Sequence, residues 1–322
     1  MQDPTELYQY ETDTPAHDMR ASVMLVALDG FVDAGHTQKL LADHILATHQ
    51  STVVASFDVD QVIDYRGRRP VMTFDRDRWT TYADPSLLLH RVVDHDGVPF
   101  FILAGPEPDY QWNRMVEAVS GLIDRLGVDL TVSVHGVPMA VPHTRPIGVT
   151  SHGTDRTLLA DNEPVFGTIQ VPGSFASLLE LRLGEAGRQA IGFAVHVPHY
   201  LAQAQFADAA LVGLERFASA TGLHLGMSEL ATRAGENRAE IAKHLQDSEE
   251  VAAVVAALEQ QYDTFLEGRS QRSLLATELR DLPTADEIGA EFEAFLKDVV
   301  DDAAGDQADA DGDDEGTPSA DR

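Results

Sequence analysis

Histidine and arginine side chains lie close together in one proline-rich segment, HGVPMAVPHTRP, which runs from His135 to Pro146. It follows the apolar run 130–134, which is typical of a buried strand. Its prolines recur at every fourth position, which excludes a helix and imposes a stiff, extended path. His143 has the chemistry to move a proton near neutral pH, and Arg145 has the charge to bind an anion. An arginine in such a loop also serves to hydrogen-bond backbone carbonyls, so both roles stay open.

The segment GFVDAGHT begins at Gly30 and has nearly the spacing of a phosphate-binding loop. His36 stands where such a loop has lysine, and Asp33 places a carboxylate where it would repel phosphate. We therefore interpret Gly30 and Gly35 as the glycines of a tight turn that lets a helix approach a strand closely. We expect Asp33 to pair with a base such as Arg145.

Several other polar residues give incomplete chemical signals. Glu107, in the segment AGPEPD, is either a general base or an ion-pair partner, and Asp109 is placed to cap the following helix. His196 and His199 have no third ligand at a diagnostic spacing, so no metal site is predicted. Ser174 lacks the Gly-x-Ser-x-Gly pattern of a hydrolase nucleophile and is expected to cap a helix. No cofactor fingerprint occurs.

Strands and helices alternate along the chain and predict an α/β core over residues 21–202. Apolar runs typical of strands occupy 23–28, 52–57, 98–103, 130–135, 147–151 and 191–197. Helical spacing occupies 34–48, 109–126 and 174–183. The region 62–93 mixes charges with β-like runs at 71–74 and 87–93, for which we expect antiparallel additions to the sheet. The polar loops would then lie at strand ends, where α/β proteins build sites.

Helical patterns alone follow the core and predict a helical C-terminal region over 203–297. It contains an αα-hairpin near 230–266 and a terminal helix near 284–297. Residues 1–20 are expected to form a polar N-terminal arm. Residues 298–322 hold ten acids and one arginine, which predicts a disordered acidic tail. Such a tail either solubilises the protein or recruits a basic partner.

Composition excludes several classes of function. The 322 residues carry a formal net charge of −30, which disfavours binding to nucleic acid. The absence of cysteine excludes disulfides, thiolate catalysis and sulfur-bound zinc. The sequence has neither an apolar run long enough to span a membrane nor a secretory signal. These features predict a cytoplasmic protein.

Five motifs, taken in order, are similar to those of the PAC2 family, which is named for proteasome assembly chaperones. They are DGFVDAG, AGPEPDYQW, HGVPMAVPHTRP, VPGSFASLLELRLGEAG and GFAVHVPHYLAQAQFADAA. The resemblance is greatest to the actinobacterial branch and runs over residues 20–295. It implies a three-layer α/β/α core resembling the phosphorylase/hydrolase-like fold, with a helical C-terminal addition.

The resemblance also implies self-association, with a trimer favoured, and a role as a chaperone-like factor. It carries no catalytic residues over to this chain. Some proteasome-binding members end in a hydrophobic residue, a tyrosine and any residue, whereas this sequence ends Ser-Ala-Asp-Arg. That mode of docking to a proteasome is therefore not expected here.

These observations lead to two hypotheses about function. The first is a self-associating chaperone-like or protein-interaction factor without enzymatic chemistry, cofactor or metal. The second is a small-molecule-binding protein or a hydrolase/phosphorylase-like enzyme that uses a cleft at the strand ends. The cleft would be formed by Gly30, Asp33, Gly35, Glu107, His135, His143 and Arg145. Convergence of these side chains on one open pocket favours the second hypothesis, and burial of Arg145 against Asp33 or Glu107 disfavours it. A third possibility is that the αα-hairpin serves only oligomerisation.

Overall fold

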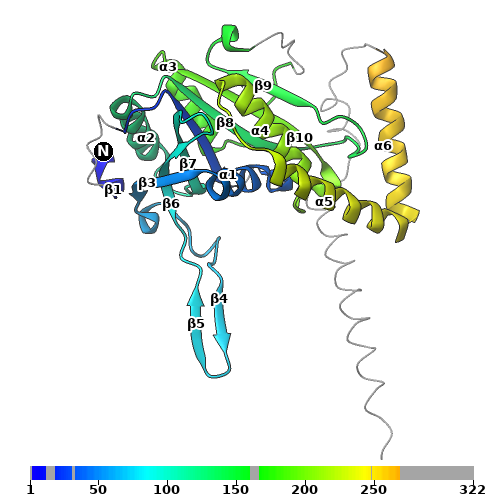
Figure 1. Cartoon of the computed structure of the whole chain (residues 1–322), viewed down its shortest axis with the longest axis horizontal. Helices are drawn as coiled ribbons and strands as arrows, with labels where there is room; N and C mark the ends of the chain where they lie inside the picture. Colours follow the sequence, from blue (N-terminus) through cyan, green and yellow to red (C-terminus); the bar gives the residue numbers. More distant parts are fainter. Residues whose placement is uncertain (1, 12–18, 31–32, 160–166, 248, 269–322) are drawn as a thin grey trace, which may run out of the picture. The chain divides into compact units, whose positions relative to one another are not determined.

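The predicted apolar runs become strands of an eight-stranded sheet, four of them its inner strands (Figure 1). The computed structural model describes residues 2–11, 19–30, 33–159, 167–247 and 249–268. In spatial order the strands are β1 (Tyr8–Tyr10), β3 (Gln50–Phe57), β6 (Leu87–Val93), β7 (Pro99–Pro106), β2 (Val23–Asp29), β8 (Leu130–Met139), β10 (Gln189–Pro198) and β9 (Val149–Gly153). The inner four, β7, β2, β8 and β10, run parallel, and the outer strands are antiparallel to their neighbours.

Helices cover both faces of the sheet, which explains why its inner strands are almost wholly apolar. Along β2, Met24 and Val26 pack with the cluster of α2 (Trp112–Leu126) and α3 (Phe175–Glu185). The alternate residue Leu25 packs with α1 (Thr37–Thr48) and α4 (Ala207–Thr221) on the other face. This arrangement confirms the predicted three-layer α/β/α fold. Two long helices follow α4 along the chain, α5 (Ser228–Asp247) and α6 (Glu249–Gly268).

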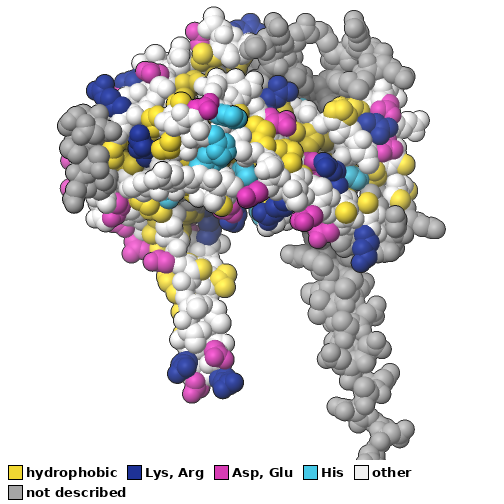
Figure 2. Space-filling model, in the orientation of Figure 1, with side chains coloured by type: hydrophobic (Ala, Val, Ile, Leu, Met, Phe, Trp, Pro, Cys, Tyr) yellow, Lys and Arg dark blue, Asp and Glu magenta, His cyan; other side chains and the backbone are white. Residues whose placement is uncertain are grey.

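One pair of strands stands outside this sheet. β4 (Met72–Asp75) and β5 (Arg78–Tyr82) pair only with each other, and every residue in both strands is exposed. This hairpin extends away from the sheet, and apolar side chains lie along it with charged ones at its free end (Figure 2). Antiparallel additions were predicted over 62–93. β6 is such an addition, whereas β4 and β5 form a separate sheet, because periodicity identifies a strand but not its partner.

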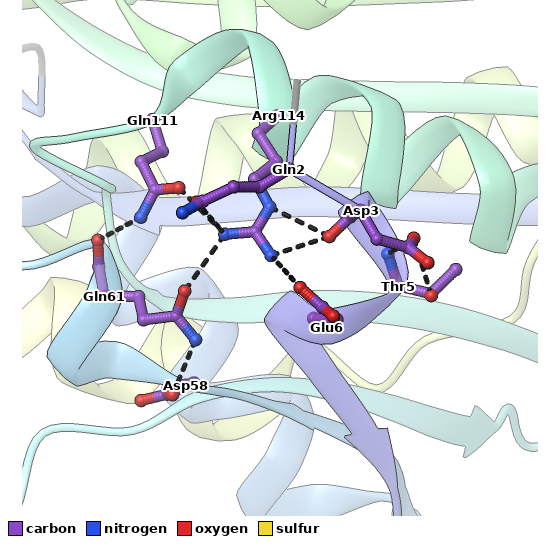
Figure 3. A network of polar contacts seen from close by, with 8 residues as sticks. All are labelled: Gln2, Asp3, Thr5, Glu6, Asp58, Gln61, Gln111 and Arg114. Atoms are coloured by element: carbon purple, nitrogen blue, oxygen red, sulfur yellow. Dashed lines mark hydrogen bonds and ion pairs between the residues drawn. The ribbon is translucent and has the colours of Figure 1, made fainter.

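The first residues of the chain dock on α2 through Arg114 (Figure 3). The guanidinium is only 6% exposed and donates two hydrogen bonds to the carbonyl of Asp3, at 2.9 and 2.6 Å. It also donates to side-chain oxygens of Gln2, Gln61, Gln111 and Glu6. The short helix η1 (Pro4–Leu7) follows, and β1 then pairs with β3 as an edge strand. Part of the segment expected as a polar arm therefore belongs to the sheet.

Two local predictions differ from the structure. The strand expected to end at His135 continues to Met139, because β10 pairs with β8 along all ten of its residues. Asp109 does not cap α2, which begins after Gln111 in a left-handed conformation. Its carboxylate instead accepts a hydrogen bond from the backbone of Asp64 and pairs with Arg68 at 2.7 Å.

Two predicted segments, the helix over 284–297 and the tail over 298–322, lie outside the described residues. Within the described part of the chain, no helix is both long and apolar enough to cross a membrane.

Candidate functional site

A small cavity lies at the carboxyl ends of β2 and β7, where a site was expected. Three of the predicted residues line it, Gly30, Glu107 and His135. Leu28, Gln38, Ser174 and Ala176 complete its wall. Its volume is about 10 Å³, which is room for about one water molecule. The cavity is therefore far smaller than the pocket of a metabolite-binding protein.

The carboxylate of Glu107 occupies the end of helix α3. The backbone N–H of Phe175, at the first position of the helix, donates to its Oε1 at 2.6 Å, and Glu107 is buried. A Cβ atom at Gly30 would overlap Oε2 of the same carboxylate, so glycine is required there. A helix N-terminus attracts anions. In this chain a protein carboxylate takes the position that a phosphate would need. Ser174 is the N-cap of α3, as predicted, and accepts from the backbone of Ser177.

Asp33 has the same role at helix α1. It accepts hydrogen bonds from the backbone N–H groups of Gln38 and Lys39, at 2.7 and 3.3 Å. Burial raises the pKa of its carboxyl from an ordinary 3.8 to about 6, although these hydrogen bonds lower it in part. The predicted pair between Asp33 and Arg145 is wrong, because the backbone of α1 satisfies the carboxylate locally.

Gly35 permits the close approach that the glycine pattern predicted. It has a φ of +70°, and a Cβ atom there would lie 3.0 Å from Cβ of Phe206. Its backbone exchanges hydrogen bonds with Ala202 and Phe206, at 2.8 and 3.0 Å. Gly35 therefore joins the start of α1 to the segment before α4 and lines no cavity among those described.

His135 lies on β8 with its ring 5.9 Å from the ring of His152 on β9. Burial, and to a lesser extent the neighbouring His152, lower the pKa of His135 to about 4. The ring is therefore neutral at pH 7. His152 itself hydrogen-bonds Oε1 of Glu180 at 2.9 Å.

The proline-rich segment holds helix α6. Arg145 donates to both carboxylate oxygens of Asp263, at 2.8 and 2.7 Å, and lies 3.3 Å from Glu259. Thr144 donates to Glu259, and Tyr262 donates to the carbonyl of Pro146 at 3.2 Å. The guanidinium lowers the pKa of Asp263. Both partners of Arg145 lie more than a hundred residues away in the chain, which sequence reasoning could not find.

His143 is fixed from the other side of the segment. Its ring and its backbone N–H both contact the hydroxyl of Tyr200, at 2.7 and 2.9 Å. Burial lowers the pKa of the imidazole, while the nearby Glu259 and Asp208 raise it. The predicted residues thus divide among the Glu107 cavity, the start of α1 and the attachment of α6. They do not line one cleft.

A wider groove adjoins the cavity at Gly30 and has a volume of about 650 Å³. Its polar lining comes from Asp29, Asp64, Arg68 and Asp109, with Tyr110 beside them. Three carboxylates against one guanidinium disfavour an anionic ligand. Sequence reasoning missed this groove because its walls come from separate segments. Among the described residues, no group of three or more His, Asp or Glu side chains is placed to hold a metal ion.

The fold and the strand-end geometry define a three-layer α/β/α protein in which buried carboxylates of the chain itself bind the N-termini of α1 and α3. The chain belongs to the PAC2 family, whose model matches residues 27–245. No curated protein matches the chain.

Solved structures are similar to the chain along most of its length. The chain is 47% identical to the Mycobacterium tuberculosis unknown function protein Rv2714, with a TM-score of 0.79 and coverage of 83% of this chain and 92% of that one. It is 36% identical to a Corynebacterium glutamicum protein of unknown function, with a TM-score of 0.76 and coverage of 82% and 99%. The M. tuberculosis proteasome-assembly chaperone homologue Rv2125 is 22% identical, with a TM-score of 0.64 and coverage of 72% and 99%, and shows a shared fold.

Replacing Asp33 by asparagine should change how stability depends on pH. The folded state raises the pKa of Asp33, so its contribution is present at low pH and is lost as the pH rises through about 6. Between pH 5 and pH 7.5 wild type should lose this contribution, whereas Asp33→Asn has no carboxyl to titrate. The free energy of unfolding of the variant minus that of wild type should therefore increase by about 1.4 kcal/mol over this range. Urea denaturation at both values measures the difference. Asp43→Asn, on the exposed side of α1, should show no such trend.

Replacing Arg145 by alanine should loosen α6 and leave the core intact. Its ion pairs are partly exposed, so we expect hydrogen exchange over residues 259–263 to accelerate roughly three- to fivefold. Exchange in β8 and β10 should stay as in wild type. Arg182→Ala, which removes an exposed ion pair on α3, is the matched control. Unchanged exchange in α6 would show that Arg145 does not hold this helix.

Proposed function

We propose that this chain is a self-associating protein-interaction factor without enzymatic activity, and that copies join through the β4–β5 hairpin. The observation that carries the proposal is an apolar face on the hairpin that nothing in the described chain covers. The family assignment supports a role in protein assembly. Structural relatives include a proteasome-assembly chaperone homologue and an archaeal proteasome activator. The capped helix ends support the absence of phosphorylase-like chemistry, and cytoplasmic action is part of the same proposal.

The register places four apolar side chains on one face of the hairpin. Met72 pairs with Tyr82, and Phe74 pairs with Trp79. A register shift between Thr73 and Phe74 brings Trp79 opposite Phe74, where their rings lie 5.0 Å apart. The four side chains are between 46% and 62% exposed. The opposite face is polar, and Thr81 donates there to Thr73 at 2.6 Å.

Such a hairpin needs a partner. An isolated two-stranded sheet is only marginally stable in water, and its unpaired edges invite strand addition. An exposed apolar patch rimmed by polar groups is typical of a protein interface. Packing the apolar face of the hairpin against another protein would stabilise the two strands and remove the exposed patch from water.

A second copy of this chain is the partner that the charges favour. Residues 64–84, the hairpin and its base, hold five arginines and four aspartates and so carry a net charge of +1, although one of the arginines, Arg68, is paired with Asp109. The whole chain has a net charge of −30, so another copy presents a strongly acidic surface to them. A hairpin that packs on the body of the next copy makes a head-to-tail contact that can close into a ring, and a trimer is the assembly we propose from the family resemblance.

The α5–α6 pair is a weaker candidate for the interface. Leu258 is buried within its own chain, and the hydroxyl of Tyr262 bonds Pro146. These two side chains of α6 are therefore engaged without a second copy.

Replacing Trp79 by glutamate should dissociate the assembly. A charge in the middle of a buried apolar face should weaken association roughly thirtyfold or more. Sedimentation velocity across a concentration series measures the change. Thr81→Glu is the matched control, since Thr81 is exposed on the same strand but on the polar face. It should keep the wild-type assembly.

Two results would contradict the proposal. One is a wild-type protein that stays monomeric at tens of micromolar. The other is equal dissociation in the two variants. The fluorescence of Trp79 also measures association directly, because the chain has only two tryptophans, Trp79 and Trp112. In a Trp112→Phe background, the emission of Trp79 should shift to the blue as the protein concentration rises.

A further inference from the structure

Three histidine rings form a continuous stack at the amino-terminal edge of the parallel strands, opposite the Glu107 cavity. The ring of His49, at the end of α1, lies 4.8 Å from the ring of His95 in the turn between β6 and β7. The ring of His95 lies 5.8 Å from that of His224, in the connection between α4 and α5. The stack therefore joins three elements that are far apart in the sequence.

His49 is the buried end of this stack. Only 8% of the residue is exposed. Its Nδ1 contacts Oγ1 of Thr48 at 2.9 Å and the carbonyl of Ile45 at 3.3 Å. Its Nε2 is buried and has no hydrogen-bond partner within the described chain. A proton added at Nε2 would place a charge where no described group accepts it.

The same histidines hold the connection that leads into α5. The backbone N–H of His95 donates to the carbonyl of His224 at 3.1 Å. His44, one turn before His49 on α1, hydrogen-bonds the carbonyl of Gly226 at 2.6 Å. A Cβ atom at Gly226 would lie 2.7 Å from Nε2 of His95, so the backbone approaches the ring closely.

The charged groups around His49 offset a proton there only in part. His95, in the turn after β6, and His44, on α1, oppose a positive charge on His49. Asp94 is the nearby acid and raises the pKa of His49, and its carboxylate also accepts from the backbones of Asp96, Val98 and His224. Asp96 faces His224 at 3.4 Å. Burial, and then the neighbouring His95, lower the pKa of His49.

We propose that the stack of His49, His95 and His224 is an acid-sensitive clasp that holds the α4–α5 connection, residues 222–227, against the α/β core. When His49 is neutral, its buried ring packs against His95 and the connection is fixed. When His49 takes up a proton, the charge is buried at a nitrogen without a partner in the described chain and is opposed by His95, and the connection and the start of α5 are released. This inference concerns the helical region and does not depend on the hairpin.

The direction of the effect follows from linkage. The pKa of a histidine in the unfolded chain is near 6.5. A histidine whose pKa is lower in the folded state stabilises the fold at a pH above 6.5, and this stabilisation is lost as the pH falls below 6.5. Other buried histidines, such as His135 and His196, act the same way on the core. A test must therefore read the connection itself rather than global unfolding.

Hydrogen exchange followed by mass spectrometry at pH 7.5 and pH 5.5, in the presence of EDTA, provides that test. After correction for intrinsic rates, protection over residues 222–230 should fall about tenfold more at pH 5.5 in wild type than in His49→Phe, while β8 and β10 lose protection equally in the two proteins. His49→Phe retains a ring that cannot take a proton, and its protection should be nearly independent of pH. His152→Gln, on β9, is the control and should behave as wild type.

Three outcomes would overturn the clasp. They are equal protection of residues 222–230 at both pH values in wild type, an unchanged loss in His49→Phe, and a difference between these two proteins that is equally large throughout the sheet. If His49→Phe does not fold, His95→Asn takes its place. It removes the neighbour that opposes a proton on His49, so protection of residues 222–230 should fall less between pH 7.5 and pH 5.5 than in wild type. The same pH dependence in both proteins would equally overturn the proposal.

Discussion

Two buried carboxylates at the starts of helices are the contacts on which the strand-end region depends. Glu107 binds the first N–H of α3, and Asp33 binds two N–H groups of α1. Each satisfies backbone donors that a buried helix start would otherwise leave unpaired. Because both acids follow strands of the same sheet, they also fix one helix on each face of it. The same contacts reduce the cavity to the size of one water molecule.

With its helix starts occupied in this way, the described part of the chain has the α/β fold without the anion-binding sites that often accompany it. In many α/β proteins the helix N-termini at the strand ends are left free for a phosphate or carboxylate of the ligand. Here the protein supplies those carboxylates itself. The raised pKa of Asp33 shows that burial carries a cost, which the backbone hydrogen bonds reduce only in part. These two helix starts are therefore poor candidates for function, and the exposed hairpin is a better one.

The sequence predicted those features that depend on local patterns. The apolar strands, the helical spacing, the Ser174 cap and the close approach at Gly35 follow from neighbouring residues. Features that depend on register or on distant partners could not be predicted. Arg145 binds Asp263, which lies 118 residues further along the chain, and Glu107 binds the backbone of Phe175, which lies 68 residues further along. The apolar face of the hairpin needs the register shift beside Phe74, and the histidine stack draws one residue from each of three segments.

The proline-rich segment shows how one motif changes meaning once its partners are known. Its first residues continue strand β8, and its last residues bind α6. The family model ends at residue 245, so α6 lies beyond the part of the chain that it matches. A segment inside the family core therefore anchors an element outside it. Arg145 has the chemistry of an anion-binding residue, and the carboxylates of the chain's own added helix are the anions that it binds.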